Sequence, residues 1–120
     1  MRYLLLIHQG TTPVPGSEAW NALSPEEQGQ VYAAYGAINA NPNITAGERM
    51  ADPDVATTVR VQDGRTLTTD GPFVELKEAV GGYFFLDADN LDEAIAVAAI
   101  VPASSMGGAV EIRPILTEGS

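Results

Sequence analysis

The sequence contains no cysteine, so neither disulfide bonds nor thiolate chemistry is available to it. His8 is its single histidine, and a zinc site would have to be built almost wholly from carboxylates, which is unusual. No glycine-rich stretch matches a nucleotide-binding fingerprint, because Gly107-Gly108 follows a predicted helix and precedes a predicted strand, the reverse of the required order. We therefore expect neither a metal site nor a cofactor.

Positive charge is also scarce. Six Lys and Arg residues face sixteen Asp and Glu residues, which gives a formal net charge of −10. A chain with this charge repels nucleic-acid phosphate, so we expect no direct binding to nucleic acid. Four of the six cations lie in one stretch of the chain: Arg49, Arg60, Arg65 and Lys77. They can form a positive pocket for an anionic ligand, or each can pair with a nearby carboxylate.

Long hydrophobic runs are absent. The apolar start, residues 1–8, is too short to span a membrane and lacks a small-residue cleavage site. We expect a strand there, no membrane association and a cytoplasmic location. Apolar residues make up 45% of the 120 residues, which suits the core of a single domain covering residues 1–120.

The pattern of apolar and turn residues predicts the order strand, helix, strand, hairpin, strand, helix, strand. Ser24, Pro25 and Glu27 predict a capped helix, and Asp63-Gly64 predicts a type I′ hairpin turn. The predicted strands cover 2–8, 44–50, 55–62, 65–69, 83–87 and 109–116, with helices from Ser24 to 41 and from Asn90 to 102 and a helical turn at 75–78. Without the hairpin this order is βαββαβ, so we predict an α+β, ferredoxin-like fold with an inserted β-hairpin.

The central strands of this predicted sheet carry apolar residues on both faces. Tyr3, Leu5 and Ile7 oppose Leu4 and Leu6, while Phe84 and Leu86 oppose Tyr83 and Phe85. Two helices cover only one face, and each large apolar side chain left in water forgoes about 1.5–3 kcal/mol. We therefore predict a homodimer that packs sheet against sheet. A ligand cavity or the hairpin can instead cover part of that face.

Several short motifs follow one another in a fixed order. They are Ala56-Thr57-Thr58-Val59-Arg60, Asp63-Gly64, Thr69-Asp70-Gly71-Pro72-Phe73-Val74-Glu75-Leu76-Lys77-Glu78, Gly81-Gly82-Tyr83, Leu91-Asp92-Glu93-Ala94 and Val110-Glu111-Ile112-Arg113-Pro114. This ordered set resembles the DGPF subgroup of the YCII-related family. The resemblance covers most of the chain and is weakest between Gln9 and Ala22.

The resemblance implies a ferredoxin-like fold in which two sheets meet face to face as a dimeric α/β barrel. Some YCII-related proteins resemble enzymes that use a His–Asp pair for proton transfer on small aromatic substrates, whereas many have no assigned reaction. Proteins similar to the DGPF subgroup are also associated with extracytoplasmic-function sigma factors. These properties imply a small-molecule site or a regulatory role.

Asp70 and His8 are the candidate catalytic residues. Asp70 ends a predicted strand before a Gly-Pro turn, where its carboxylate can act as a general base or simply cap the turn. His8 ends the first strand and can pair with Asp70 as acid and base, or it can be a partly exposed strand-end histidine. Family enzymes that use histidine carry it near the first helix, and this helix has none, so His8 departs from that pattern.

Five further residues are candidate ligand-binding groups: Arg60, Glu75, Lys77, Tyr83 and Arg113. Arg60 can hold a carboxylate or phosphate in a bidentate way, whereas Arg113 can simply pair with Glu111 on the same face. Glu75 and Lys77 can line the mouth of the turn or lie on an exposed helical turn. Tyr83 can offer its phenol to a ligand or pack at an interface.

Three functions remain compatible with the sequence. The first is a small-molecule binding protein or cofactor-independent enzyme, with a cleft at the dimer interface near Asp70 that takes a small anionic or aromatic ligand. The second is a regulatory module that associates with a sigma factor. The third is a structural dimer that has lost its activity.

Overall fold

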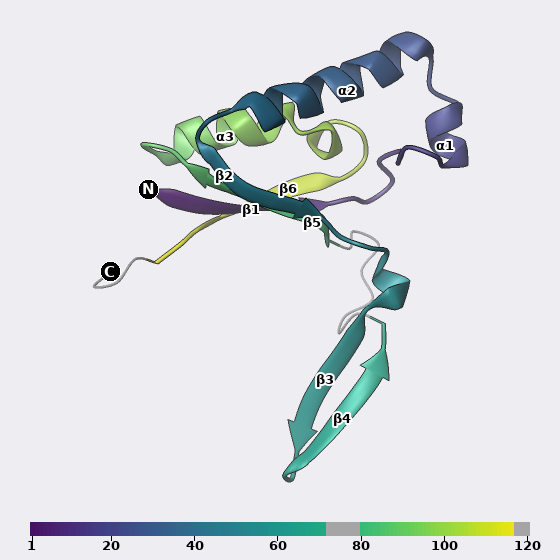
Figure 1. The fold of residues 1–120 in the computed structure, drawn as a ribbon, viewed down its shortest axis with the longest axis vertical. Coiled ribbons are helices and arrows are strands. Elements are labelled where there is room, and N and C mark those ends of the chain that lie inside the picture. The colour runs from purple at the N-terminus through teal and green to yellow at the C-terminus, as the bar shows by residue number, and fades with distance from the viewer. Residues whose placement is uncertain (72–79, 117–120) are drawn as a thin grey trace.

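The computed structural model describes residues 1–71 and 80–116. Its body is a four-stranded antiparallel sheet with the order β2-β5-β1-β6. These strands are β1 (Arg2–His8), β2 (Ile44–Arg49), β5 (Val80–Asp87) and β6 (Ala109–Pro114). The long helices, α2 (Pro25–Ala40) and α3 (Leu91–Ile100), both lie on one face of this sheet (Figure 1). The fold is therefore mixed α+β, with the βαββαβ order expected of a ferredoxin-like domain.

The remaining elements are short. Helix α1 (Glu18–Asn21) precedes α2, and the 3-10 turns η1 (Pro53–Val55) and η2 (Pro102–Ser104) follow β2 and α3. Strands β3 (Thr57–Gln62) and β4 (Arg65–Asp70) form a two-stranded sheet of their own. Figure 1 shows this hairpin projecting away from the four-stranded sheet, on the side opposite the helices. None of the helices described is long and apolar enough to cross a membrane.

Local sequence signals account for the ends of the helices. The Ser24 hydroxyl accepts a hydrogen bond from the Glu27 amide, and the Glu27 carboxylate accepts one from the Ser24 amide, so the predicted capping box is present. Asn90 caps α3 by accepting from the Glu93 amide, but the Glu93 carboxylate accepts from Asp89 rather than from Asn90. The predicted hairpin turn is confirmed by positive φ angles of 52° at Asp63 and 75° at Gly64.

Several boundaries differ from the sequence-based expectation. Val55 belongs to η1 instead of β3, because Pro53 starts a 3-10 turn there. Pairing with Thr57 extends β4 to include Asp70, and β6 ends at Pro114. Leu91 and Ile95 share apolar helical spacing with Ala94 and Ala98, which favours one buried face, yet Leu91 and Ile95 stay about half exposed. The small residues Ala94 and Ala98 make the contact with the core. The predicted helical turn at 75–78 lies outside the described residues.

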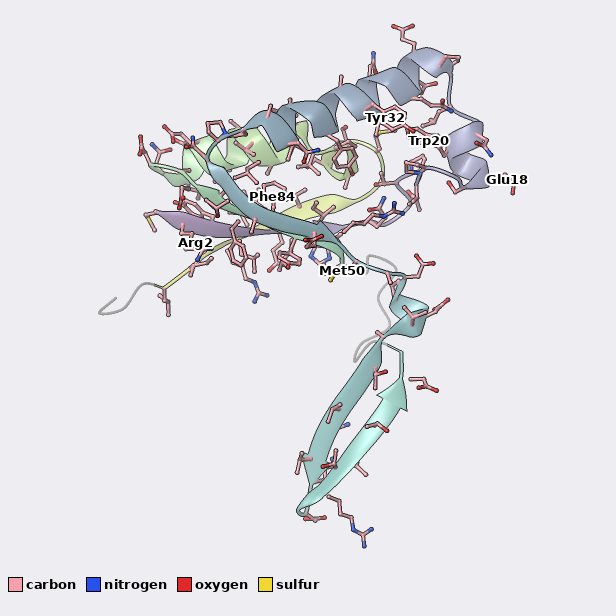
Figure 2. All side chains as sticks on the ribbon, viewed as in Figure 1. Arg2, Glu18, Trp20, Tyr32, Met50 and Phe84 are labelled. Carbon is pink, nitrogen blue, oxygen red and sulfur yellow. The ribbon has the colours of Figure 1, made fainter. Side chains whose placement is uncertain are left out.

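The core lies between the sheet and the two helices. Its buried members include Tyr3 and Leu5 of β1, Phe84 and Leu86 of β5, and Ile38 of α2. Strand register places the opposite set of side chains together on the other face, which we call the open face. That set is Arg2, Leu4, Leu6 and His8 of β1, Ala46 and Glu48 of β2, Tyr83, Phe85 and Asp87 of β5, and Glu111 and Arg113 of β6. Figure 2 shows the contrast, with Phe84 directed toward the helices and Arg2 directed away from them.

Candidate functional site

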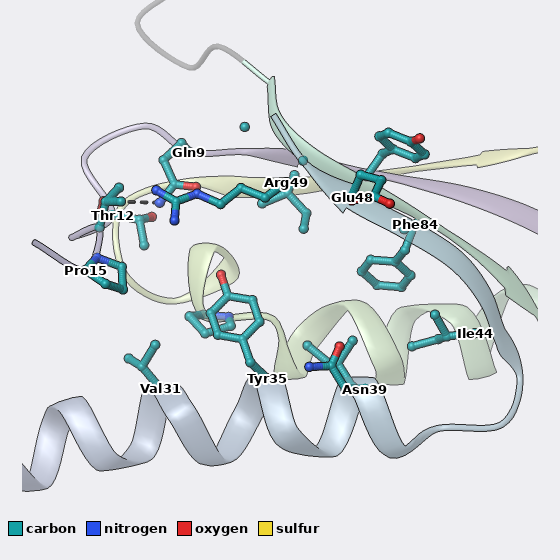
Figure 3. Close-up of a pocket in the computed structure, with 18 of the residues that line it drawn as sticks. Gln9, Thr12, Pro15, Val31, Tyr35, Asn39, Ile44, Glu48, Arg49 and Phe84 are labelled. Atoms are coloured by element: carbon teal, nitrogen blue, oxygen red, sulfur yellow. Dashed lines mark hydrogen bonds between the residues drawn. The ribbon is translucent and has the colours of Figure 1, made fainter. Parts of the chain in front are cut away.

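A cavity of about 620 Å³ lies between α2 and the helix-facing side of the sheet. This volume is within the range of roughly 300–1,000 Å³ that is typical of small-molecule sites. One wall is apolar, with Val31 and Ile38 from α2, Ile44 from β2 and Phe84 from β5. The other end is polar and contains Gln9, Thr12, Tyr35 and Arg49 (Figure 3). The cavity therefore suits a molecule with an apolar body and a polar head.

Glycines on the helix-facing side of the sheet make room for this cavity. Gly82 lies between Arg49 and Ile7 in the strand register, and it has no side chain to fill the space under α2. A Cβ atom at Gly82 would lie 3.1 Å from the Glu48 carbonyl oxygen, and one at Gly47 would lie 2.6 Å from the Phe84 Cβ. Gly47 thus requires glycine, and Gly82 leaves little room for a side chain, because two strands approach closely there.

The loop after β1 is fixed by close backbone packing against the turn before β6. Gly10 has a φ of 54°, and a Cβ atom there would lie 2.2 Å from the Gly107 carbonyl oxygen. The Thr11 amide donates a hydrogen bond of 3.0 Å to the same oxygen. The Gln9 side chain donates to the Thr12 carbonyl at 3.3 Å. This loop therefore holds Gln9 and Thr12 at the polar end of the cavity.

Arg49 supplies positive charge to the cavity. It is the last residue of β2, and Figure 3 shows its side chain extending across the cavity toward Gln9 and Thr12. No carboxylate of residues 1–71 or 80–116 forms an ion pair with Arg49. A guanidinium group presents a planar fork of donors that matches a carboxylate. Arg49 can thus receive the anionic head of a ligand.

Tyr35 rises from α2 into the same polar end (Figure 3). Burial raises the pKa of its phenol above the ordinary value, and the positive charge of Arg49 opposes that rise. The phenol therefore stays protonated at neutral pH and can donate a hydrogen bond. Tyr35 and Arg49 both line the polar end of the cavity, so they can act on one ligand.

Thr12 forms part of the cavity wall and is buried, with only 6% of its surface exposed. Its hydroxyl oxygen has no hydrogen-bond partner among the described residues. A buried hydroxyl without a partner is costly, by about 1–3 kcal/mol. Within residues 1–71 and 80–116, the polar end of the cavity therefore contains a hydroxyl without a hydrogen bond beside an arginine without an ion pair.

A second group of polar residues lies on the open face. His8 Nε2 is 3.2 Å from Glu111 Oε1, and the Arg113 guanidinium donates to the other oxygen of Glu111. These two hydrogen bonds, chiefly that from Arg113, hold the pKa of the Glu111 carboxyl below its ordinary value. The expected pairing of Arg113 with Glu111 is present, and His8 shares the same carboxylate.

The structure separates the two predicted catalytic residues into different sheets. His8 ends β1 in the body, whereas Asp70 ends β4 in the hairpin and is exposed. The Asp70 carboxylate has no hydrogen bond within the part of the chain that is described, although the backbone beside it is held by a bond of 2.7 Å from the Gly71 amide to the Ala56 carbonyl. Neither residue belongs to the cavity lining.

The other predicted ligand-binding residues are also dispersed. Arg60 is exposed on the hairpin. Tyr83 lies on the open face, where its ring packs edge to face against Phe85 with 5.9 Å between the ring centroids. Among the described members of this set, Tyr83 alone also borders the cavity. Glu75 and Lys77 lie outside the described residues.

Sequence reasoning did not assign the polar end of the cavity. The sequence marks Arg49 only as one of four clustered cations, and the helical spacing of Tyr35 with Val31 and Ile38 favours a packing role. The strand register holds a signal that could have located the site. Gly47 and Arg49 lie on the core side of β2, and Arg49 is paired with Gly82 of β5. This arrangement leaves a charged residue beside empty space on the core side of a sheet.

Comparison with known proteins identifies the family. The YCII-related domain model matches residues 1–118, so the chain belongs to the YCII-related family. An uncharacterised protein, R00369, of Rhizobium meliloti strain 1021 is 33% identical over 101 residues, covering 79% of this chain and 81% of that protein.

A solved structure is also similar over almost the full length. It is the 5-chloro-2-hydroxyhydroquinone dehydrochlorinase TftG of Burkholderia phenoliruptrix AC1100, in complex with 2,5-dihydroxybenzoquinone. The two chains are 16% identical with a TM-score of 0.48, and the match covers 97% of this chain and 94% of TftG.

Proposed function

We propose that this protein binds a small aromatic carboxylate in the cavity between α2 and the sheet. The observation that carries this proposal is Arg49, a guanidinium without an ion pair in the described chain, at the mouth of a largely apolar cavity. An aromatic ring fits against the wall of Val31, Ile38 and Phe84, and the carboxylate meets Arg49 and the Tyr35 phenol. The apolar wall supplies affinity, and the charged end selects for an anion.

Calorimetry with benzoate and 4-hydroxybenzoate, set against the neutral benzamide and benzyl alcohol, tests this proposal. The acids should bind and the neutral compounds should not. Arg49→Met keeps the length of the side chain but removes its charge, and it should weaken benzoate binding by about tenfold or more, since hydrogen bonds to charged groups contribute about 1.5–3 kcal/mol. Arg65→Met is the matched control, because Arg65 starts β4 in the hairpin, away from the cavity.

The open face supports a homodimer. Its centre is formed by Leu4, Leu6, Tyr83 and Phe85, which the two helices leave uncovered. A second copy packed sheet against sheet buries these side chains, as in the dimeric α/β barrel expected of the DGPF subgroup. In such a dimer, the His8–Glu111–Arg113 group lies at the interface.

The cleft predicted near Asp70 remains a second candidate, because a partner copy can bring Asp70 beside residues that are distant within one chain. Asp70→Asn separates the two sites. Loss of benzoate binding in Asp70→Asn but not in Arg49→Met would move the site to the dimer interface. Retained binding in both variants would exclude both sites. The proposed association with a sigma factor gains no support from the described structure and stays a prediction of the resemblance.

A further inference from the structure

The β3–β4 hairpin stands apart from the rest of the protein. In the part of the chain that the structure describes, its strands pair with each other and with no strand of the body, and every residue from Val59 to Asp70 is exposed. The radius of gyration is 16.5 Å, whereas a compact chain of this length has about 14 Å. The hairpin is therefore a projecting arm rather than part of the folded core.

One face of this arm carries its two valines. Val59 and Val61 are 58% and 67% exposed, and they share their face with Thr66 and Thr68 of β4 and, at the base of the arm, with Thr57 and Asp70. The opposite face carries the charged and amide side chains of Arg60, Gln62 and Arg65 together with Leu67. An isolated two-stranded hairpin is only marginally stable in water. An arm with exposed valines on one face therefore needs a surface that covers them.

The direction of the arm indicates which surface covers the two valines. Figure 1 shows the arm extending beyond the open face, away from the helices. A second sheet packed on the open face would lie about 10 Å away, and strands of six residues reach about 20 Å. The arm is thus long enough to run past the sheet of any molecule that packs there.

Charge favours a second copy as that molecule. The arm, Thr57 to Asp70, carries two arginines and two aspartates, and the open face carries two arginines against three carboxylates. The whole chain has six cations and sixteen carboxylates. Two copies that repel each other elsewhere can therefore meet through these nearly neutral surfaces.

We propose that the β3–β4 hairpin is a dimerisation arm whose Val59–Val61 face packs against a second copy of the chain seated on the open face. This inference rests on the homodimer put forward above, and it adds that the arm, and not the sheets alone, holds the two copies together. Each copy contributes one arm, as a two-fold arrangement requires.

The absence of cysteine allows a direct test. Val61→Cys introduces a unique thiol on the Val59–Val61 face of the arm, and Gln62→Cys introduces one on the opposite face. Their rates of reaction with a thiol reagent are measured across a dilution series, with the oligomeric state followed by analytical ultracentrifugation. We expect the Val61→Cys thiol to react at least tenfold more slowly in the dimer than after dilution, and the Gln62→Cys thiol to change much less.

The outcomes separate the two proposals. A monomer at every concentration overturns both the homodimer and the arm. A dimer in which both thiols react equally fast at all concentrations overturns the arm and leaves the homodimer standing. If the Val61→Cys thiol is protected to the same degree at every dilution, residues of the same chain cover it. That result also overturns the proposed dimerisation arm.

Paired substitutions give a second readout. Val59→Ser combined with Val61→Ser should raise the dimer dissociation constant by about tenfold or more, whereas Leu67→Ser, which removes an exposed apolar side chain from the other face, should change it less than about twofold. Equal effects of the two changes on the dissociation constant would contradict a contact made by the Val59–Val61 face alone.

Discussion

The two faces of the four-stranded sheet differ in what covers them more than in what they are made of. On the helix-facing side, Leu5 and Leu86 are almost fully buried, whereas Leu4, Leu6 and Phe85 on the open face are only partly buried. Both faces are apolar at the centre of the sheet, so hydrophobic pattern alone does not distinguish core from interface. The covered face also contains Gly47 and Gly82, and both line the cavity. The proposed ligand site and the proposed dimer interface therefore lie on opposite faces of the same sheet.

Leucine truncations on the two sides of β1 sharpen this comparison and give the largest expected effect. Leu5→Ala should lower the free energy of unfolding by about 2–5 kcal/mol, because a fully buried leucine is replaced by a cavity. Leu6→Ala should cost much less within one chain but should weaken the dimer. Urea unfolding at several protein concentrations measures both.

The two truncations differ in how they respond to concentration. The loss of unfolding free energy in Leu5→Ala should be the same at every protein concentration. The loss in Leu6→Ala should grow as the protein is concentrated into dimers. A Leu6→Ala deficit that does not depend on concentration would show that the open face stays in contact with water.

Thr12→Val addresses the cavity wall and should have a smaller effect of opposite sign. The change replaces a hydroxyl that has no partner in the described chain by a methyl group of similar size. We expect stability to rise by about 1 kcal/mol, because no hydrogen bond is lost and a buried polar group is removed. Thr11→Val is the control, since the Thr11 hydroxyl is exposed and donates to Gly107 at 3.4 Å. A loss of stability in Thr12→Val, measured by thermal unfolding, would mean that the hydroxyl is satisfied.

Most of the fold could be predicted because its signals are local. The Ser24 capping box, the Asp63-Gly64 turn and the apolar run of β1 each act within a few residues, and the structure confirms all three. The cavity could not be predicted in the same way, since Arg49 and Tyr35 meet only after β2 and α2 pack together. Tyr35 illustrates the difficulty, because its helical spacing with Val31 and Ile38 fits a core position equally well.

Acid titration probes the polar group of the open face and should give the smallest effect. Because Arg113 and His8 hold the pKa of Glu111 below its ordinary value in the folded protein, ionised Glu111 stabilises the fold. This contribution is complete above the ordinary carboxyl pKa and is lost as the pH falls through the lowered value. We therefore expect Glu111→Gln to be less stable than the wild type at neutral pH, with the difference shrinking as the pH falls through the lowered pKa of Glu111.

The urea midpoints of the wild type and Glu111→Gln along this pH series measure the effect. They also test whether a second copy covers the open face. If a second copy covers the open face, desolvation strengthens the hydrogen bonds to Glu111, so the difference between wild type and Glu111→Gln should be larger in the dimer than in the dilute monomer. Glu93→Gln is the matched control, because Glu93 accepts a hydrogen bond at the start of α3, on the other side of the sheet. A difference for Glu111→Gln that stays constant down to the acid limit would show that its carboxylate does not stabilise the folded state by charge.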